Sequence, residues 1–259
     1  MSNNLPIQIV VGERGSTFSA KNAPNLKVDE QPAGINFYTI RFTPKSRGRA
    51  LILVGHKPFS IDHVISITGS EDVDLREEGI SEFHINSSID GSGTILHDDA
   101  RLKFFNIVRN ITNAGWRSII PRGMARLRGK SMTQYLLENK KYTTLDASYI
   151  PSLNEWMRIP SLTVWEFYLD QTYLSLKFTR ENSLQDPLKP GAYLVSFDIQ
   201  SEAEYFRSYV DSSDRKNWRE ILPKELRTLA ESRAKMEEAM RKKGEVIDSA
   251  YVDPRVTTK

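Results

Sequence analysis

The sequence predicts an α+β fold, with helices packed on one face of antiparallel sheets and a long charged helix near the C-terminus. Three observations support this prediction. Alternating, aromatic-rich runs between Thr163 and Ile199 are typical of strands. After Asp98, apolar residues recur with a helical period. The stretch Lys224–Lys243 contains Glu-to-Lys and Glu-to-Arg pairs four residues apart, which favour a helix.

The segment from Thr163 to Ile199 predicts a three-stranded antiparallel meander with one core face. Its runs are TVWEFYL, TYLSLKFT and AYLVSFDI, separated by Asp170-Gln171 and by a Pro-rich loop. Alternate residues of a strand point to the same side, so each run has one apolar side. The inward residues are Trp165, Phe167 and Leu169, then Leu174, Leu176 and Phe178, then Tyr193, Val195, Phe197 and Ile199. We expect the C-terminal half to be built on this meander.

Length and composition allow one large domain or two of ordinary size. The chain has 259 residues, of which 39% are hydrophobic and 27% charged. A boundary near 121–130 or 145–162 divides the chain best. The first choice gives α+β subdomains 1–125 and 126–259, and a single continuous core is the alternative.

Several classes of protein are excluded or disfavoured by simple features. The chain has no cysteine, which excludes disulfides, zinc–thiolate sites and cysteine nucleophiles. No apolar run approaches the roughly 20 residues that cross a bilayer, and no signal peptide precedes Pro6. The sequence as it stands indicates the cytoplasm, or the periplasm if a leader or anchor has been removed from its start.

The first 89 residues predict strands around a polar loop. Gly12–Gly34 is expected to be that loop, and its Gly12-Glu-Arg-Gly-Ser-Thr17 run lacks the Gly-Lys-Ser/Thr ending of a phosphate loop and a helix after it. Ile35–Phe42 and Ala50–Val54 are expected to pair as a hairpin. The other expected strands are Pro6–Val11, His63–Thr68 and Gly79–Ile89.

Helix signals begin at Asp98. A core-facing helix is expected from Asp98 to the stop signal Asn113-Ala-Gly115, followed by a strand at Trp116–Ile120. A basic loop covers Pro121–Gly129. Capping boxes then predict two short helices, one from Ser131 to about Asn139 and one that begins after Ser152.

After the meander the sequence predicts helices and a tail. Ser201 caps a short helix, and Arg215–Leu222 is expected to be helical. Pro223 is expected in the first turn of the last helix, Lys224–Lys243, where its missing N–H costs least. This helix has a narrow apolar stripe, so we expect it to lie along a surface or to project. Glu245–Lys259 is expected to be a loosely held tail.

Charge is segregated along the chain. Residues 71–99 hold nine acidic residues against one basic, and residues 101–141 hold ten basic against one acidic. The two stretches either pair with each other as solvated faces, or one of them docks a partner of opposite charge. The candidate partner-binding residues are Glu71, Asp72, Asp74, Glu77, Glu78, Arg122, Arg126, Arg128 and Lys130.

No motif predicts a catalytic, cofactor or metal site. The four histidines lack metal-ligand spacing, and His97-Asp98-Asp99 fits the polar start of a helix. Gly91-Ser-Gly-Thr lacks the spacing of a serine nucleophile elbow. Glu166 and Asp170 flank a strand and are the one carboxylate pair that suggests glycosidase chemistry. The basic excess is too small, and too poor in aromatic residues, to predict nucleic-acid binding.

Several short motifs carry a resemblance over roughly Ile80 to Tyr251. They are His97-Asp-Asp-Ala-Arg101, Ala114-Gly-Trp116, Arg126-Leu-Arg-Gly129, Tyr142-Thr-Thr-Leu-Asp146 and Leu153-Asn-Glu-Trp-Met157, together with the meander. With them the chain resembles uncharacterised proteobacterial immunity proteins of type VI secretion systems, particularly those against lipase effectors. The resemblance implies a non-catalytic inhibitor that binds a toxin and blocks its active site. It supplies no functional residues.

Three functions follow as hypotheses. The first is a protein-binding immunity factor whose partner is a cognate toxin. The second is a structural or adaptor component of a secretion or envelope assembly, with Lys224–Lys243 as its docking arm. The third is a hydrolase that uses Asp or Glu.

Overall fold

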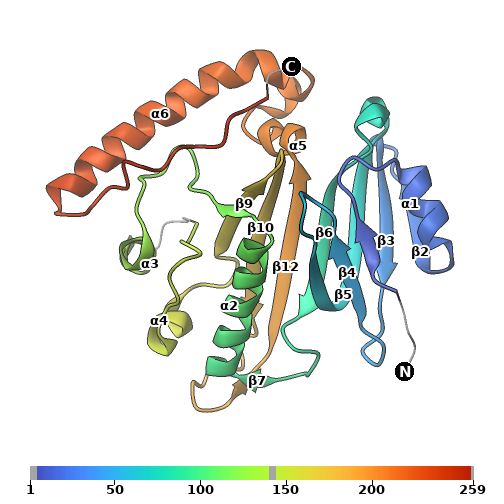
Figure 1. Ribbon diagram of the computed structural model, residues 1–259, viewed down its shortest axis with the longest axis horizontal. Helices are drawn as coiled ribbons and strands as arrows, with labels where there is room; N and C mark the ends of the chain where they lie inside the picture. The colour runs from blue at the N-terminus through green and yellow to red at the C-terminus, as the bar shows by residue number, and fades with distance from the viewer. Residues whose placement is uncertain (1–4, 140–143, 258–259) are drawn as a thin grey trace.

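A ten-stranded, mostly antiparallel sheet organises the molecule. The computed structural model describes residues 5–139 and 144–257. Eight strands follow one another in space: β1 (Ile7–Ile9), β4 (Gly48–Ile52), β5 (Phe59–Asp72), β6 (Ile80–Ser88), β12 (Tyr193–Ser201), β10 (Thr172–Arg180), β9 (Val164–Leu169) and β8 (Arg117–Ser118) (Figure 1). Strand β3 (Ile35–Arg41) pairs with β5 and carries β2 (Leu26–Glu30) on its outer edge. Two short strands, β7 (Ile95–Leu96) and β11 (Pro190–Gly191), form a separate sheet.

The sheet is continuous between the two halves of the chain. Strands β6 and β12 pair from Ser88↔Leu194 to Glu82↔Gln200, so the expected subdomains 1–125 and 126–259 share one sheet. The main hydrophobic core contains residues of both, from Ile9 to Tyr251.

The predicted meander is confirmed, and its apolar side is the core face. Strands β9, β10 and β12 pair in register, for example Trp165↔Leu176↔Phe197. All of these side chains are at most 1% exposed. Asp170 and Gln171 form the tight turn between β9 and β10, and both have positive φ.

Two helices cover the core face. Helix α2 (His97–Asn113), which confirms the predicted helix, packs Phe104 against Trp165, with ring centroids 4.7 Å apart. Helix α1 (Gly15–Asn22) packs Phe18 against Phe83. Both helices lie on the same side of the sheet (Figure 1).

A second, smaller core lies on the opposite face at one end of the strands. It contains Ile119, Tyr173, Phe206, Trp218 and Leu222. These residues join β10 to α5 (Glu202–Arg207) and to the start of α6 (Trp218–Lys242). This end of the outer face is therefore covered by helices.

The remaining helices are short. They are α3 (Gly129–Asn139), α4 (Leu153–Arg158) and the 3₁₀ helices η1 (Ala23–Asn25), η2 (Val73–Glu78) and η3 (Ser212–Asn217). The capping box before α4 is confirmed, because Ser152 and Glu155 exchange the two expected hydrogen bonds.

Two predictions for the first half were wrong. The polar stretch Gly12–Gly34 contains α1 and β2, and α1 begins at Gly15, within the Gly12–Thr17 run. The sequence hides these elements because α1 buries only Gly15 and Phe18, and because β2 is a mostly exposed edge strand. Strands β3 and β4 do not form a hairpin with each other. Both pair with β5, which is 14 residues long and therefore has room for two partners along one edge.

Three predictions for the second half were also wrong. The strand expected at Trp116–Ile120 is only two residues long, Arg117–Ser118. Helix α6 begins at Trp218 and runs through Pro223, since the buried Trp218 and Leu222 hold its first turns in the second core. The C-terminal tail is anchored along the molecule, with Tyr251 and Pro254 buried.

Candidate functional site

The acidic segment Glu71–Glu78 begins with a buried carboxylate. Glu71 accepts hydrogen bonds from the backbone amide of Gly15, at 2.9 Å, and from the hydroxyl of Tyr38, at 2.7 Å. Burial, together with the bond to Glu71, raises the pKa of Tyr38 to about 12. Glu71 therefore fixes the start of α1 against β3. Glu77 lines a cavity of about 700 Å³ together with Glu71.

The rest of the acidic segment pairs with the C-terminal part of the chain. Arg207 of α5, only 4% exposed, donates two hydrogen bonds to Glu78. Lys216 donates to Asp74 at 2.8 Å, and both side chains are well exposed. Asp72 caps η2 by accepting from the backbone of Asp74.

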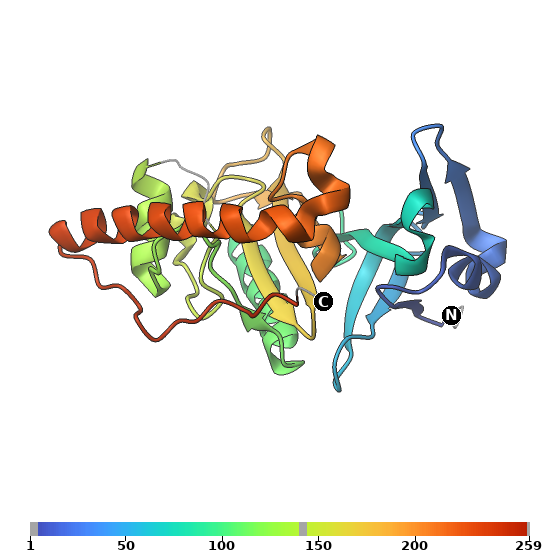
Figure 2. The ribbon, with the colours of Figure 1, turned by 90° about the horizontal axis from the view of Figure 1, so that it is seen from above.

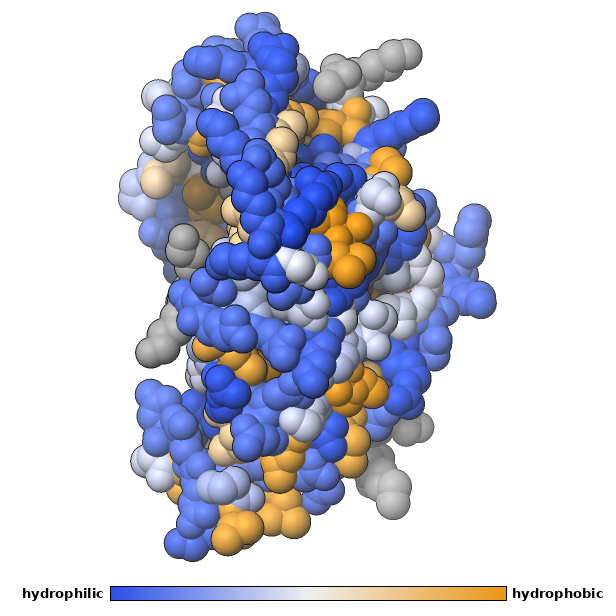
Figure 3. Space-filling view, turned by 90° about the vertical axis from the view of Figure 1, so that its left-hand side faces the viewer, coloured by the Kyte–Doolittle hydropathy of each residue, from blue (hydrophilic) through white to orange (hydrophobic). Residues whose placement is uncertain are grey.

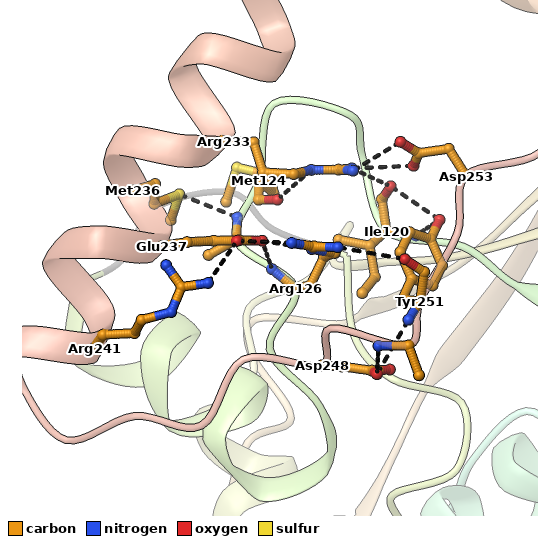
Figure 4. Close-up of polar contacts among 12 residues, drawn as sticks. Ile120, Met124, Arg126, Arg233, Met236, Glu237, Arg241, Asp248, Tyr251 and Asp253 are labelled. Atoms are coloured by element: carbon orange, nitrogen blue, oxygen red, sulfur yellow. Dashed lines mark hydrogen bonds and ion pairs between the residues drawn. The ribbon is translucent and has the colours of Figure 1, made fainter.

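The basic loop lies between α6 and the tail, as Figure 4 shows. Arg126 makes two parallel hydrogen bonds to Glu237 of α6, Nε–Oε1 at 2.6 Å and Nη2–Oε2 at 2.9 Å. These bonds lower the pKa of Glu237, whose side chain is only 4% exposed. Arg128 donates to Asp248 of the tail at 2.8 Å. Lys130 lies in the first turn of α3 and is exposed.

Arg233 of α6 completes this arrangement. It donates to the carbonyl oxygens of Met124 and Pro121 and to the carboxylate of Asp253. Arg122 donates to the carbonyl oxygen of Pro254 at 2.5 Å. We call this group the arginine cluster: Arg122, Arg126, Arg128, Arg233 and the backbone of Ile120.

The acidic and basic stretches thus have partners in the C-terminal third of the chain. The contacts described above join the acidic stretch to α5 and η3, and the basic stretch to α6 and the tail. The expectation that the two stretches pair with each other holds in part, since Lys103 pairs with Asp90 and Arg101 with Asp98. The other contacts tie distant parts of the chain together.

A different polar group lies on the outer face of the sheet, opposite α2. The pairing registers place Thr68, His84, Asp198, Ser175 and Glu166 side by side in one row across five strands. Thr68, His84, Ser175 and Asp198 are partly or fully exposed, whereas the carboxylate of Glu166 is buried. We call this surface the polar face, formed by Ser66, Thr68, Glu82, His84, Asn86, Glu166, Ser175, Lys177, Ser196, Asp198 and Gln200.

At the centre of the polar face, Asp198 binds two cationic side chains. Lys177 Nζ lies 2.5 Å from one carboxylate oxygen, and His84 Nδ1 contacts the other. The hydrogen bond to Asp198 raises the pKa of His84. Burial works to raise the pKa of Asp198, but the hydrogen bonds from His84 and Lys177 outweigh it and lower that pKa. Asp198 therefore stays ionised at neutral pH.

Glu166 lies at the end of the row, under α5. Burial raises the pKa of Glu166 to about 7, and a hydrogen bond from the Tyr205 hydroxyl partly offsets this. The Tyr205 ring stacks on Tyr173, with centroids 3.8 Å apart, and its hydroxyl lies 3.0 Å from that of Tyr209. Glu166 can thus take up and release a proton near neutral pH.

The fold does not bring together Glu166 and Asp170, the carboxylate pair that the sequence suggests as a site. Asp170 belongs to the exposed turn after β9, whereas Glu166 lies within the sheet under α5. The carboxylate that shares a row with Glu166 is Asp198, two strands away, with Ser175 between them.

His97 has a structural role. His97 begins α2, is fully buried, and accepts a 2.5 Å hydrogen bond from the Tyr193 hydroxyl. That hydroxyl also accepts from Trp156 and from the buried Arg180. Within residues 5–139 and 144–257, no three His, Asp or Glu side chains form a group that could hold a metal ion.

The sequence predicts no site on the polar face. The alternation of β10 places Ser175 and Lys177 on the side away from the core, which is the local signal for this face. The pairing of β6 with β12 joins segments more than 100 residues apart. His84 and Asp198 therefore could not be placed together from the sequence.

Comparison with known proteins supplies no relative of this chain. In the part of the chain that the structure describes, no helix combines the length and apolar character needed to cross a membrane. Neither a protein-family model, nor a curated protein, nor a solved structure gives a significant match.

Proposed function

We propose that this chain is a non-catalytic protein-binding factor that docks its partner on the polar face. The observation that carries the proposal is the central row of this face, in which Lys177 and His84 are held on Asp198 while remaining partly exposed. Such side chains are ordered before binding, so little conformational entropy is lost when a partner covers them. Mixed charges in fixed positions favour a specific partner with complementary charges.

The dimensions of the polar face suit a protein partner. From Thr68 to Ser175 the exposed part of the row crosses four neighbouring strands, which makes it about 14 Å wide at roughly 4.8 Å per strand. A patch of this width can form the centre of an ordinary interface, which buries about 800 Å² per partner. Tyr205 of α5 and Tyr209, just after this helix, border the patch and supply aromatic residues of the kind that anchor interfaces.

The resemblance narrows the kind of partner. It implies an immunity protein that neutralises a cognate secreted bacterial toxin, a lipase effector, by covering its active site. The acidic and basic segments have structural partners within the chain, so we assign recognition to the polar face and not to Glu71–Glu78 or Arg122–Lys130.

Co-purification with the product of the adjacent gene tests this function. The two proteins are expected to form a stable complex, and mixing them is expected to abolish the hydrolytic activity of the partner. Absence of a complex with that product would overturn the assignment as an immunity factor.

A second candidate, a hydrolase that uses Asp or Glu, is favoured by one observation. Glu166 has its pKa raised to about 7 and Asp198 has its pKa lowered, a split typical of general acid and base pairs. If this candidate holds, hydrolysis of chromogenic glycosides by the purified chain is lost in Glu166→Gln and kept in Asp170→Asn. A parent chain that hydrolyses none of them removes this candidate.

A further inference from the structure

The C-terminal tail binds the arginine cluster in the way a peptide ligand binds its receptor. Tyr251 is its central anchor. The Tyr251 hydroxyl accepts a hydrogen bond from the backbone amide of Ile120, at 2.9 Å, and donates to the carbonyl oxygen of the same residue, at 3.3 Å. The ring lies within 6 Å of the guanidinium groups of Arg128 and Arg233, both in cation–π geometry. Aromatic and arginine groups in this arrangement are typical of interface hot spots.

Carboxylates flank the Tyr251 anchor on both sides. Asp248 accepts from Arg128 at 2.8 Å, and its backbone amide donates to the carbonyl oxygen of Arg126. Asp253 accepts two hydrogen bonds from Arg233, at 2.7 and 3.1 Å. The arginine cluster thus binds an Asp-x-x-Tyr-x-Asp segment (Figure 4). Its guanidinium groups pair with both carboxylates, and the tyrosine is held by cation–π contacts and by the backbone of Ile120.

Between and before these anchors the tail has exposed side chains. Val246 and Val252 are 82% and 78% exposed. A cavity of about 690 Å³ opens beside Tyr251 and is lined by tail residues as well as Arg117 and Arg128. The tail therefore lies over the surface at separate points of contact and is not packed along its whole length.

The chain reverses direction between α6 and the tail, at the end of α6 that projects from the molecule. Figure 2 shows α6 extending to one end of the molecule and the tail running back beside it. The turn includes Gly244, with φ of +83°, and exposed neighbours. On the side of the molecule toward which α6 projects, hydrophobic residues occur in separate small groups among hydrophilic ones (Figure 3).

We propose that the arginine cluster also accepts the Asp248–Asp253 segment of a second copy of this chain, so that two copies exchange their tails. The contacts of Asp248–Asp253 with the arginine cluster can also be made between two molecules, because none of them involves the connection 244–247. The folded-back form is favoured by the effective concentration of the attached tail and by the hydrogen bonds of Gly244 and Glu245 to the end of α6. This site is separate from the polar face and does not depend on the function proposed for it.

A labelled peptide tests the site directly. The probe is a fluorescein-labelled peptide of residues 245–257, added to the full chain carrying Asp248→Asn and Tyr251→Ala, in which the resident tail has lost two anchors. We expect the probe to bind this variant at least about tenfold more tightly than the parent chain, whose own tail competes. The same peptide with Tyr251→Ala is the matched control and should bind at least about tenfold more weakly. Equal binding of the two peptides, or no binding to the folded variant, would overturn the proposal.

A second variant leaves the contacts between the tail and the arginine cluster unchanged. Deletion of Gly244–Val246 keeps every anchoring residue but shortens the connection, so the tail reaches a neighbouring molecule more readily than its own. Size-exclusion chromatography with light scattering should then show twice the parent's mass, with unchanged circular dichroism. A folded monomer at all concentrations would contradict tail exchange.

Discussion

The arginine cluster and the polar face both contain paired charged side chains, but the pairs join different kinds of elements in the two regions. In the arginine cluster, Arg126–Glu237 and Arg233–Asp253 join a loop, a helix and a tail that share no backbone ladder. In the polar face, Asp198 binds His84 and Lys177 on strands that backbone hydrogen bonds already join. Removing the first set loosens the chain, whereas removing the second leaves the sheet intact.

This difference separates structural charge from charge available for recognition. The Glu237 side chain is 4% exposed, while His84 and Lys177 are 46% and 30% exposed. A partner that covers the polar face meets polar groups already in position. A partner at the arginine cluster must first displace the tail.

The core beneath the polar face should be the most sensitive part. Trp165 is fully buried and packs against Phe104 from the inner side of β9. Trp165→Ala should lower the free energy of unfolding by about 3–5 kcal/mol, because a large aromatic truncation leaves a cavity. Urea denaturation measures this, with the exposed Val252→Ala expected to change it by less than about 0.5 kcal/mol. A Trp165→Ala variant that kept its stability but lost partner binding would show that the inner face is an interface.

The arginine cluster should be sensitive to loss of one carboxylate. Glu237→Ala leaves Arg126 without its two hydrogen bonds in a partly buried position, which should cost about 2 kcal/mol of unfolding free energy. The neighbouring Glu238, 66% exposed, also pairs with a cation on α6, so Glu238→Ala is the matched control and should cost less than about 0.5 kcal/mol. Equal effects of the two substitutions in thermal or urea unfolding would mean that the cluster does not hold α6 and the tail.

The polar face should show its own pH dependence through Glu166. Its folded-state pKa of about 7 exceeds the ordinary value of 4.5, so the folded chain binds the proton more tightly than the unfolded chain. Stability should therefore fall as pH rises from about 4.5 to 7, by on the order of 2 kcal/mol. Glu166→Gln should remove this fall and be more stable than the parent at pH 8, while Asp170→Asn should behave as the parent does. A parent-like pH profile for Glu166→Gln would contradict the burial of this carboxylate.

His84 should contribute a smaller effect of defined direction. Its raised pKa means that the folded chain holds this proton more tightly, so the stabilisation is complete below about pH 6.5 and is lost as pH rises through the folded-state pKa. His84→Gln should abolish that part of the pH dependence. The His84 imidazole chemical shift, followed by NMR, measures the pKa directly, and a value below 6.5 would be inconsistent with the Asp198 contact.

The sequence was informative where periodicity was strong. The meander and α2 were predicted with nearly the observed bounds, since alternating or helical apolar patterns are local. Helix α1 and strand β2 were missed because their side chains are mostly polar or exposed. Charged residues were recognised as a group, but several of their partners lie more than 100 residues away along the chain. Pairing over such separations is set by the fold and leaves no local pattern.

The central claim is that the polar face, and not the arginine cluster, recognises the partner. Thr68 lies in the central row beside His84, and Ser232 lies on the exposed side of α6. Thr68→Arg and Ser232→Arg add the same large, charged group at these two places. Isothermal titration calorimetry with the adjacent gene's product should show at least tenfold weaker binding for Thr68→Arg and parent affinity for Ser232→Arg, with both variants as stable as the parent. Parent affinity for a folded Thr68→Arg would contradict the claim.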